Sequence, residues 1–260
     1  DFGNTNITYA LSGDDAEYFT LDGSTLKLNS DVSANYEVKT KYTLTVTATN
    51  SAGETITEKV VIKIANVNEA VNLTTALLDQ SNNEDAGFSF TIPNDSFTDI
   101  DGDAITYSVT LDDGSALPSW LSFDAATQTF TGTPLNADVG VINVTVTATD
   151  GSFSVTDTFA LTVVNTNDDP TALSLSATTI DENSLGGVIG DLTTTDDDNI
   201  NGDTHTYTLS GTDASSFEIV NGQLKLKAGV SANYETQSTY AVTVTSTDGS
   251  GSTLSLIHFS

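Results

Sequence analysis

The sequence predicts an all-β protein built from β-sandwich domains in tandem. Three observations predict it: strict alternation of apolar residues and threonines, turn residues between the alternating stretches, and a long internal repeat. The alternation is clearest in "KYTLTVTAT" (41–49), "GVINVTVTAT" (140–149) and "YAVTVTST" (240–247). A period of two places one set of side chains on a core face and the other on a solvated face, where β-branched threonine is favoured. The sequence shows no convincing amphipathic helix.

Turn-forming residues separate these stretches at regular intervals. Gly, Asn and Asp gather in "LSGDD", "DIDGD", "LDDG", "ATDGS" and "TDGSG", as expected for tight turns. Short alternating strands with turns at regular spacing are typical of β-sandwiches.

An internal repeat divides the chain. "VSANYE" occurs at 32–37 and again at 230–235, and residues 8–53 align with 206–251 without a gap. A period this long indicates two similar domains with a different one between them. We predict a partial domain over 1–69, a second domain over 70–169, and a third over 170–260 whose C-terminal strand is incomplete. Because the first segment matches only the later part of the third, we also consider that the C-terminal "STLSLIHFS" of one copy completes the first domain of another by strand donation.

The composition excludes several functions. Seven Lys and Arg face 36 Asp and Glu, which gives a formal net charge of −29. Nucleic-acid binding needs a basic face, and docking on anionic membranes needs basic residues too. The acidic excess leaves three explanations open, namely divalent-ion binding, adaptation to high salt and solubility. There is no Cys, no Met, no leader and no run of 18 apolar residues, so we expect a soluble segment of a longer chain.

Acidic residues gather at predicted turns and linkers. In "DIDGD", Asp99, Asp101 and Asp103 alternate, and alternate carboxylates can converge on one hard cation. Asp150 and Asp248 follow alternating strands in the same way. The pattern is not an EF-hand, because the glycine and the final glutamate of that loop are missing. The alternative is that Asp and Gly here only form turns.

At this point the residues resemble a known family. "TYTL", "LKL", "NYE" and the linkers "NVNEA" (66–70) and "NTNDDP" (165–170) resemble cadherin repeats of bacterial surface proteins. "LPSWLSFDAATQTFTGTP" (117–134) in the middle segment resembles the dystroglycan-type cadherin-like domain. The resemblance implies tandem Ig-like/cadherin-like Greek-key β-sandwiches in a linear array, as part of a large surface adhesin.

The resemblance also implies calcium ions at the domain junctions. At the first junction the implied ligands, together with the neighbouring Asp103, are Glu37, Asn66, Asn68, Glu69, Asp99, Asp101 and Asp150. At the second junction they are Glu84, Asn165, Asn167, Asp168, Asp169, Asp196, Asp198 and Asp248. Glu182 and Glu235 would serve a third junction. Asn35 and Asn233 stand where the family often has Asp, and the middle segment has no "NYE", so we expect fewer ions at the second junction.

We therefore expect a non-enzymatic, calcium-stiffened adhesion or extender segment at a bacterial cell surface. One alternative is an extracellular filament subunit that binds other copies of itself by strand donation. Another is a carbohydrate-binding module for surface polysaccharide. Trp120 is expected to pack in the core rather than stack on a sugar, and neither His205 nor His258 forms a recognisable catalytic triad or zinc site.

Overall fold

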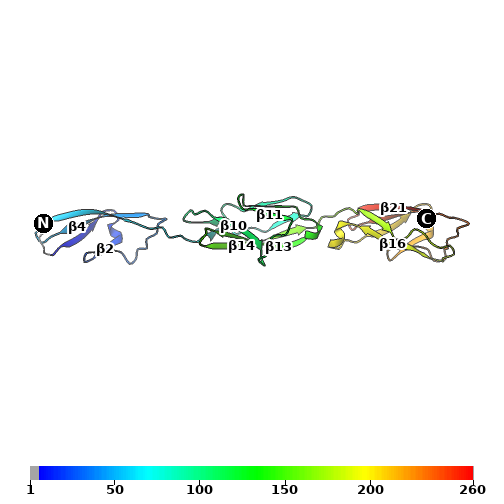
Figure 1. Ribbon diagram of the computed structural model, residues 1–260, viewed down its shortest axis with the longest axis horizontal. Coiled ribbons are helices and arrows are strands. Elements are labelled where there is room, and N and C mark those ends of the chain that lie inside the picture. Colours follow the sequence, from blue (N-terminus) through cyan, green and yellow to red (C-terminus); the bar gives the residue numbers. More distant parts are fainter. Residues whose placement is uncertain (1–5, 260) are drawn as a thin grey trace. The chain divides into compact units, whose positions relative to one another are not determined.

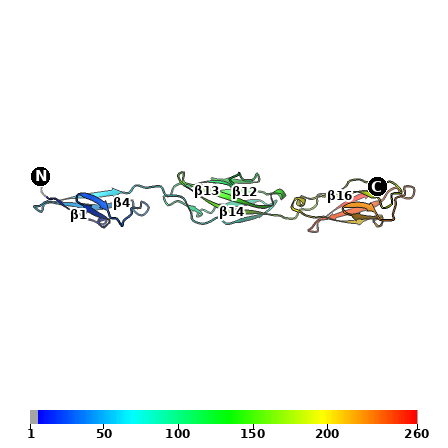
Figure 2. The ribbon, with the colours of Figure 1, turned by 90° about the horizontal axis from the view of Figure 1, so that it is seen from below.

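A computed structural model describes residues 6–259 of the chain. Strands make up 45% of the chain and helix 6%, and arrows dominate the ribbon in both views (Figures 1 and 2). The helical segments in the described part are short 3-10 helices of three to five residues. None of the described helices is long and apolar enough to cross a membrane. The predicted all-β fold with domains in tandem is confirmed.

The chain forms two compact units. The first contains the residues up to Ala76 together with Asn94–Tyr107 and Thr147–Thr156. The second contains Leu77–Pro93, Ser108–Val146 and the residues from Asp157 onward. Each linker that the sequence singled out therefore lies inside one unit, 65–70 in the first and 164–170 in the second.

The first unit contains two small sheets and a strand pair. The sheets are β1-β4-β5 and β2-β3, and the pair is β6-β9. The elements are β1 (Thr8–Ser12), η1 (Ala16–Tyr18), β2 (Phe19–Asp22), β3 (Thr25–Leu28), β4 (Lys41–Thr49), β5 (Thr55–Lys63), β6 (Asn72–Leu73) and β9 (Phe97–Thr98). Three further strands contribute residues to both units: β10 (Thr106–Leu111), β13 (Gly140–Thr149) and β14 (Ser154–Val164).

The second unit contains three complete sheets. Their strand orders are β11-β12-β8, β15-β16-β19-β18 and β17-β20-β21, and a fourth sheet has the order β10-β13-β14-β7. Its first elements are β7 (Gln80–Asn83), β8 (Phe88–Thr91), β11 (Leu121–Asp124), β12 (Thr129–Gly132) and η2 (Asn136–Asp138). The later elements are β15 (Ala172–Leu175), β16 (Val188–Thr195), η3 (Asp197–Asn201), β17 (Thr206–Ser210), η4 (Ala214–Ser216), β18 (Phe217–Val220), β19 (Gln223–Leu226), β20 (Ala241–Thr247) and β21 (Thr253–Phe259).

The predicted alternation decides which side chains enter the core. Along β4, Tyr42 and Leu44 are buried and pack with Phe19. Along β20, Val242 and Val244 are buried in the same way. The intervening threonines are half-buried rather than fully exposed, because each lies beside a side chain of a neighbouring strand.

Aromatic rings fill the core between β8, β12 and β14. Phe130 and Phe159 are almost completely buried, with ring centroids 5.6 Å apart, and Phe90 and Phe123 pack against them. Trp120 is half-buried beside β12. A Cβ at Gly132 would come within 2.1 Å of the carbonyl oxygen of Trp120. Glycine is therefore required at position 132. This position supports the packing role that we expect for Trp120.

The internal repeat is reproduced in three dimensions. β1, β2 and β3 correspond to β17, β18 and β19 at an offset of 198 positions, and η1 corresponds to η4. The third segment adds β16, which pairs with β19, and β15, which pairs with β16. Within the described residues of the first segment, β2 and β3 have no such partner strands.

The C-terminal strand pairs within its own chain. β21 pairs with β20 of its own chain from Thr253 to Phe259. Its counterpart β5 already pairs with β4 in the first segment. Strand donation between copies therefore stays a prediction: β5 fills the place that corresponds to β21, whereas β2 and β3 pair only with each other among the described residues.

Candidate metal sites

The first acidic cluster consists of Glu37, Glu69 and Asp101. One carboxylate oxygen from each lies within 4.8 Å of the others. Glu37 comes from the turn before β4, Glu69 from the linker after β5, and Asp101 from the turn after β9. All three belong to the first unit. Segments far apart in the sequence thus bring three negative charges together.

Hydrogen bonds to the backbone hold this cluster in place. Asp99 Oδ1 accepts from the N–H groups of Asp101 at 2.9 Å and Asp103 at 3.3 Å, which closes the turn. Asp101 Oδ2 accepts from the N–H of Glu69 at 2.7 Å and so ties the turn to the linker. The alternating aspartates of "DIDGD" therefore fix one another, and Asp99, Asp101 and Asp103 form a second close group.

Three carboxylate oxygens of this region are buried without a donor. They are Glu37 Oε1, Asp99 Oδ2 and Asp101 Oδ1. A buried acceptor without a partner costs about 1–3 kcal/mol, and more when it is charged. Oxygens of this kind are the ligands that Ca²⁺ prefers. The residues present therefore fit a hard cation.

The electrostatics agree with this geometry. Burial, followed by repulsion from Asp101 and Glu37, raises the pKa of Glu69 above its ordinary value. The N–H of Glu69 lowers the pKa of Asp101, and the side chain of Asn66 adds to the effect. The cluster therefore contains one carboxylate stabilised in its charged form beside one that is destabilised.

Asn68 and Asp150 lie beside the cluster but form their own pair. Asn68 Nδ2 donates to Asp150 Oδ2 at 2.9 Å. Asp150 Oδ1 accepts from the N–H groups of Ser152 and Phe153. The N–H of Phe153 lowers the pKa of Asp150, and the amide of Asn68 lowers it further. The structure therefore links the linker to the end of β13, as expected for residues of one junction.

The second acidic cluster consists of Glu84, Asp168, Asp196 and Asp198, all in the second unit. Glu84 is only 2% exposed. Its Oε1 accepts from the N–H of Thr166 at 2.7 Å, whereas its Oε2 is buried without a partner. Burial raises the pKa of Glu84, and the charges of Asp198 and Asp168 raise it further. This side chain is therefore a candidate ligand with one oxygen to spare.

Side-chain amides and backbone donors satisfy much of this second cluster. Asp198 Oδ1 accepts from Asn165 Nδ2 at 2.9 Å, and Asp198 Oδ2 accepts from the N–H of Asp168 at 2.6 Å. Asn136 Nδ2 donates to Asp168 Oδ2 at 2.5 Å. Asn136 Oδ1 accepts from Asn201 Nδ2 at 3.0 Å. η2 and η3 are thereby joined by direct protein contacts.

His205 contacts the carboxylate oxygen of Asp196 that does not bond to Asp198. Its Nε2 lies 2.9 Å from Asp196 Oδ2, and its side chain is 8% exposed. Asp196 Oδ1 accepts from the N–H of Asp198, and Asp203 lies close enough to complete a group of three possible ligands. His205 therefore has a polar partner that the sequence did not reveal.

Asn167 and Asp248 repeat the arrangement of Asn68 and Asp150. Asn167 Nδ2 donates to Asp248 Oδ2 at 3.0 Å. Burial raises the pKa of Asp248, but hydrogen bonds from Asn167, Ser250 and the N–H groups of 251–252 outweigh burial and lower it to about 2. Asp248 is therefore strongly stabilised as a carboxylate.

The remaining predicted residues do not join either cluster. Asp169 is exposed in the linker, and Glu182 and Glu235 are exposed in loops of the third segment. Sequence reasoning also missed Asn136 and His205. Asn136 carries no pattern that marks it. The signal that could have marked His205 is its place two residues before the tyrosine of "TYTL".

This fold belongs to the class of cadherin-like all-β domains in tandem. Residues 70–164 match a family model described as "Putative Ig domain". No curated protein matches the chain in sequence.

Several solved cadherin structures share the fold. Protocadherin Gamma B2 extracellular cadherin domains 1–5 match with a TM-score of 0.65 and 17% identity, over 97% of this chain and 52% of that one. Human CDH23 EC21–23 matches with a TM-score of 0.62 and 17% identity, over 98% and 88%. Mouse Cadherin-23 EC22–24 matches with a TM-score of 0.60 and 18% identity, over 97% and 84%. The chain thus spans about half of the protocadherin chain that it matches.

Proposed function

We propose that this chain is a calcium-stiffened adhesion or extender segment of an extracellular protein at a bacterial cell surface, without enzymatic activity. The observation that carries the proposal is the set of buried, unpartnered carboxylate oxygens of Glu37, Asp99 and Asp101 beside the linker residue Glu69. Without a cation these charges repel one another next to a linker. A bound divalent cation would remove that repulsion.

Each cluster takes its ligands from a linker and from the sandwiches that flank it. In the first, Glu69 belongs to the linker, whereas Glu37 and Asp101 come from turns on either side of it in the sequence. In the second, Asp168 belongs to the linker, and Glu84 and Asp198 come from the flanking segments. Calcium would supply the positive charge that lets these carboxylates share one ligand sphere. The linkers would then lose freedom when the ion binds, which is the proposed stiffening.

The three-domain division at 69/70 and 169/170 is part of the proposal, as is a dystroglycan-type middle domain. Glu182 and Glu235 would serve a further junction of the same kind. Extracellular calcium modules bind with dissociation constants of roughly 10⁻⁴–10⁻³ M. We therefore propose that the linkers are stiff at external calcium concentrations and loose at the far lower concentrations inside a cell.

Thermal unfolding with and without calcium tests this function. We expect millimolar calcium to raise Tm by several degrees, because an ion that binds only the folded state stabilises it. Glu37→Ala or Asp99→Ala should remove much of that gain, whereas Glu58→Ala, which changes an exposed carboxylate on β5, should keep it. An unchanged Tm at millimolar calcium would contradict the proposal.

A further inference from the structure

A pocket of about 350 Å³ lies at the tip of the third segment, away from both acidic clusters in the sequence. It is formed by residues 179–182, between β15 and β16, and by the 232–240 loop before β20. This loop contains most of the second copy of "VSANYE". The repeated motif therefore contributes Ala232 and Tyr234 to one wall of the pocket.

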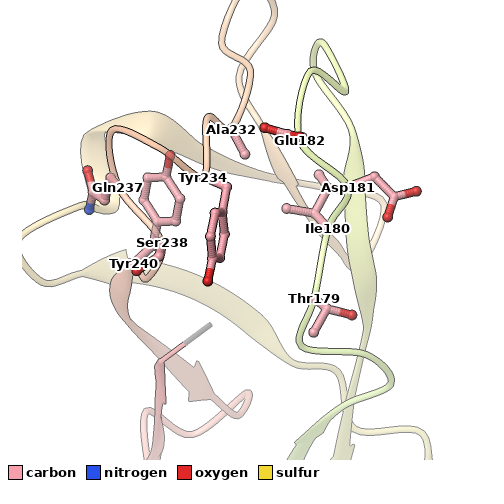
Figure 3. A pocket seen from close by; sticks show the side chains of 9 residues that line it. All are labelled: Thr179, Ile180, Asp181, Glu182, Ala232, Tyr234, Gln237, Ser238 and Tyr240. Carbon is pink, nitrogen blue, oxygen red and sulfur yellow. The ribbon is translucent and has the colours of Figure 1, made fainter.

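The two walls of the pocket differ in chemistry (Figure 3). The loop wall presents the rings of Tyr234 and Tyr240, and the opposite wall presents Ile180. Ala232 is buried, whereas Tyr234 is 69% exposed. An exposed tyrosine ring beside an apolar floor offers a surface for a ligand with an apolar stem.

The charges at the pocket are negative only. In Figure 3 the carboxylate of Glu182 extends toward Ala232, whereas that of Asp181 turns outward. None of the nine lining residues is Lys or Arg. A positively charged ligand would therefore meet a carboxylate and an aromatic face with no competing cation in the wall.

The first segment shows how the corresponding place is filled when the chain supplies its own cation. Lys39 stands at the position of Gln237, and Tyr42 at that of Tyr240. The Lys39 ammonium lies 5.0 Å from the Tyr42 ring centroid and 5.2 Å from that of Tyr18. It also forms an ion pair with Asp15. Ammonium groups at this distance from an aromatic face are attracted to it.

The third segment keeps the carboxylate but lacks the lysine. Asp213, the counterpart of Asp15, accepts from Gln237 Nε2 at 3.1 Å and from the N–H of Ala241 at 2.7 Å. The neutral amide of Gln237 satisfies the hydrogen bond without cancelling the charge. Ser216 replaces Tyr18, which removes one aromatic ring. The same framework thus keeps its negative charge without a lysine to balance it.

From this comparison we propose that the pocket binds the protonated amine and apolar stem of a lysine side chain presented by a partner protein. The stem would lie against Tyr234 and Ile180, and the ammonium would pair with Glu182. The proposed function assigns Glu182 to a further calcium junction, so calcium would compete for this carboxylate, and lysine binding is tested in the absence of calcium.

The test is an NMR titration of the full chain in a chelating buffer with N-acetyl-lysine methylamide. We expect saturable shifts of the backbone amides of 232–240, with a dissociation constant on the order of millimolar. The matched probe N-acetyl-norleucine methylamide has the same stem without the ammonium. Equal binding of both probes, or no saturable shift in this loop, would overturn the proposal.

Variants separate the contributions. Tyr234→Ala and Glu182→Gln change exposed residues and should each weaken lysine binding roughly two- to fivefold, as expected for an exposed cation–π contact or ion pair. Gln237→Lys should weaken lysine binding, because it places a second positive charge among the lining residues of the pocket. Unchanged affinity in Tyr234→Ala and Glu182→Gln would assign the probe to another surface and overturn the site.

Discussion

The two acidic clusters share ligand types but differ in how their charges are satisfied. In and beside the first, three carboxylate oxygens are buried without a donor, on Glu37, Asp101 and the neighbouring Asp99. The second leaves one, on Glu84, because amides and backbone N–H groups reach the others. N–H donors of the protein thus stabilise most of the negative charge of the second cluster. The first cluster has fewer such donors, and a cation would have the larger effect there.

The donors of the second cluster explain this difference. Asn136 and Asn165 direct their amides at Asp168 and Asp198, and η2 contacts η3 through Asn201. The first cluster has the backbone N–H of Glu69 and the Asn66 amide as its main donors. We infer that calcium controls the first junction more strongly than the second.

The largest expected effect is at Asp101. Asp101→Asn removes a negative charge from the first cluster and replaces one carboxylate oxygen with an NH₂ group, which cannot bind a cation. We expect calcium affinity there to fall by roughly 10–100-fold, the range seen when groups that support a metal site are lost. An NMR titration can follow the amide of Glu69 for the first cluster and that of Thr166 for the second.

The comparison requires that this loss be local. Glu58→Gln is the matched control for an exposed carboxylate and should leave both titrations unchanged. If Asp101→Asn weakens calcium binding at Thr166 as much as at Glu69, the two clusters are not independent and the comparison fails.

The next effect is that of Glu84→Gln on the free energy of unfolding, and its sign should depend on whether calcium is present. Glu84→Gln replaces a buried carboxylate that has one unpaired oxygen. In a chelating buffer we expect it to stabilise the chain by about 1–3 kcal/mol, the cost of burying such a group. With calcium it should instead reduce the stabilisation by the ion, because a ligand is lost. Urea unfolding in both buffers measures the two changes.

The pH dependence of the same variant checks the cause. Because the pKa of Glu84 is raised in the folded state, the folded chain binds the proton more tightly than the unfolded chain. The wild-type carboxyl therefore favours folding fully below its unfolded pKa of about 4.3, and this contribution is lost as pH rises through the folded pKa. In chelating buffer, the advantage of Glu84→Gln should vanish at low pH and grow as pH rises. An advantage that does not depend on pH would contradict this cause.

The sequence was sufficient where the signal is local. The alternation in 41–49 and 240–247 predicted which residues of β4 and β20 are buried, because side chains of a strand alternate whatever their partners are. Asp99 and Asp101 were predicted as neighbours because they share one turn. That Glu37 approaches them followed only from the resemblance, since no local pattern brings a residue 64 positions away to that turn.

Partners across the fold could not be predicted in this way. Asn136 reaches Asp168 and Asn201 only because η2 lies against η3, and no spacing in the sequence encodes that contact. His205 has no cysteine and no partner motif in the sequence, and its partner Asp196 lies on the other side of a 3-10 helix. Lys39 and Gln237 occupy equivalent positions in the repeat. Only the structure shows that Lys39 lies beside two tyrosine rings and a carboxylate, whereas Gln237 donates to a carboxylate.

The smallest expected effect tests the protein contacts of the second cluster. Asn136→Ala removes the amide that joins Asp168 and Asn201. We expect a loss of about 1 kcal/mol in chelating buffer, the net contribution of such hydrogen bonds, and a smaller loss with calcium, because the ion would take over the charge of Asp168. Calcium titration followed at Glu69 should not change. A loss that is larger with calcium than without it would show that Asn136 supports the ion rather than replacing it, and would reverse the contrast drawn between the two clusters.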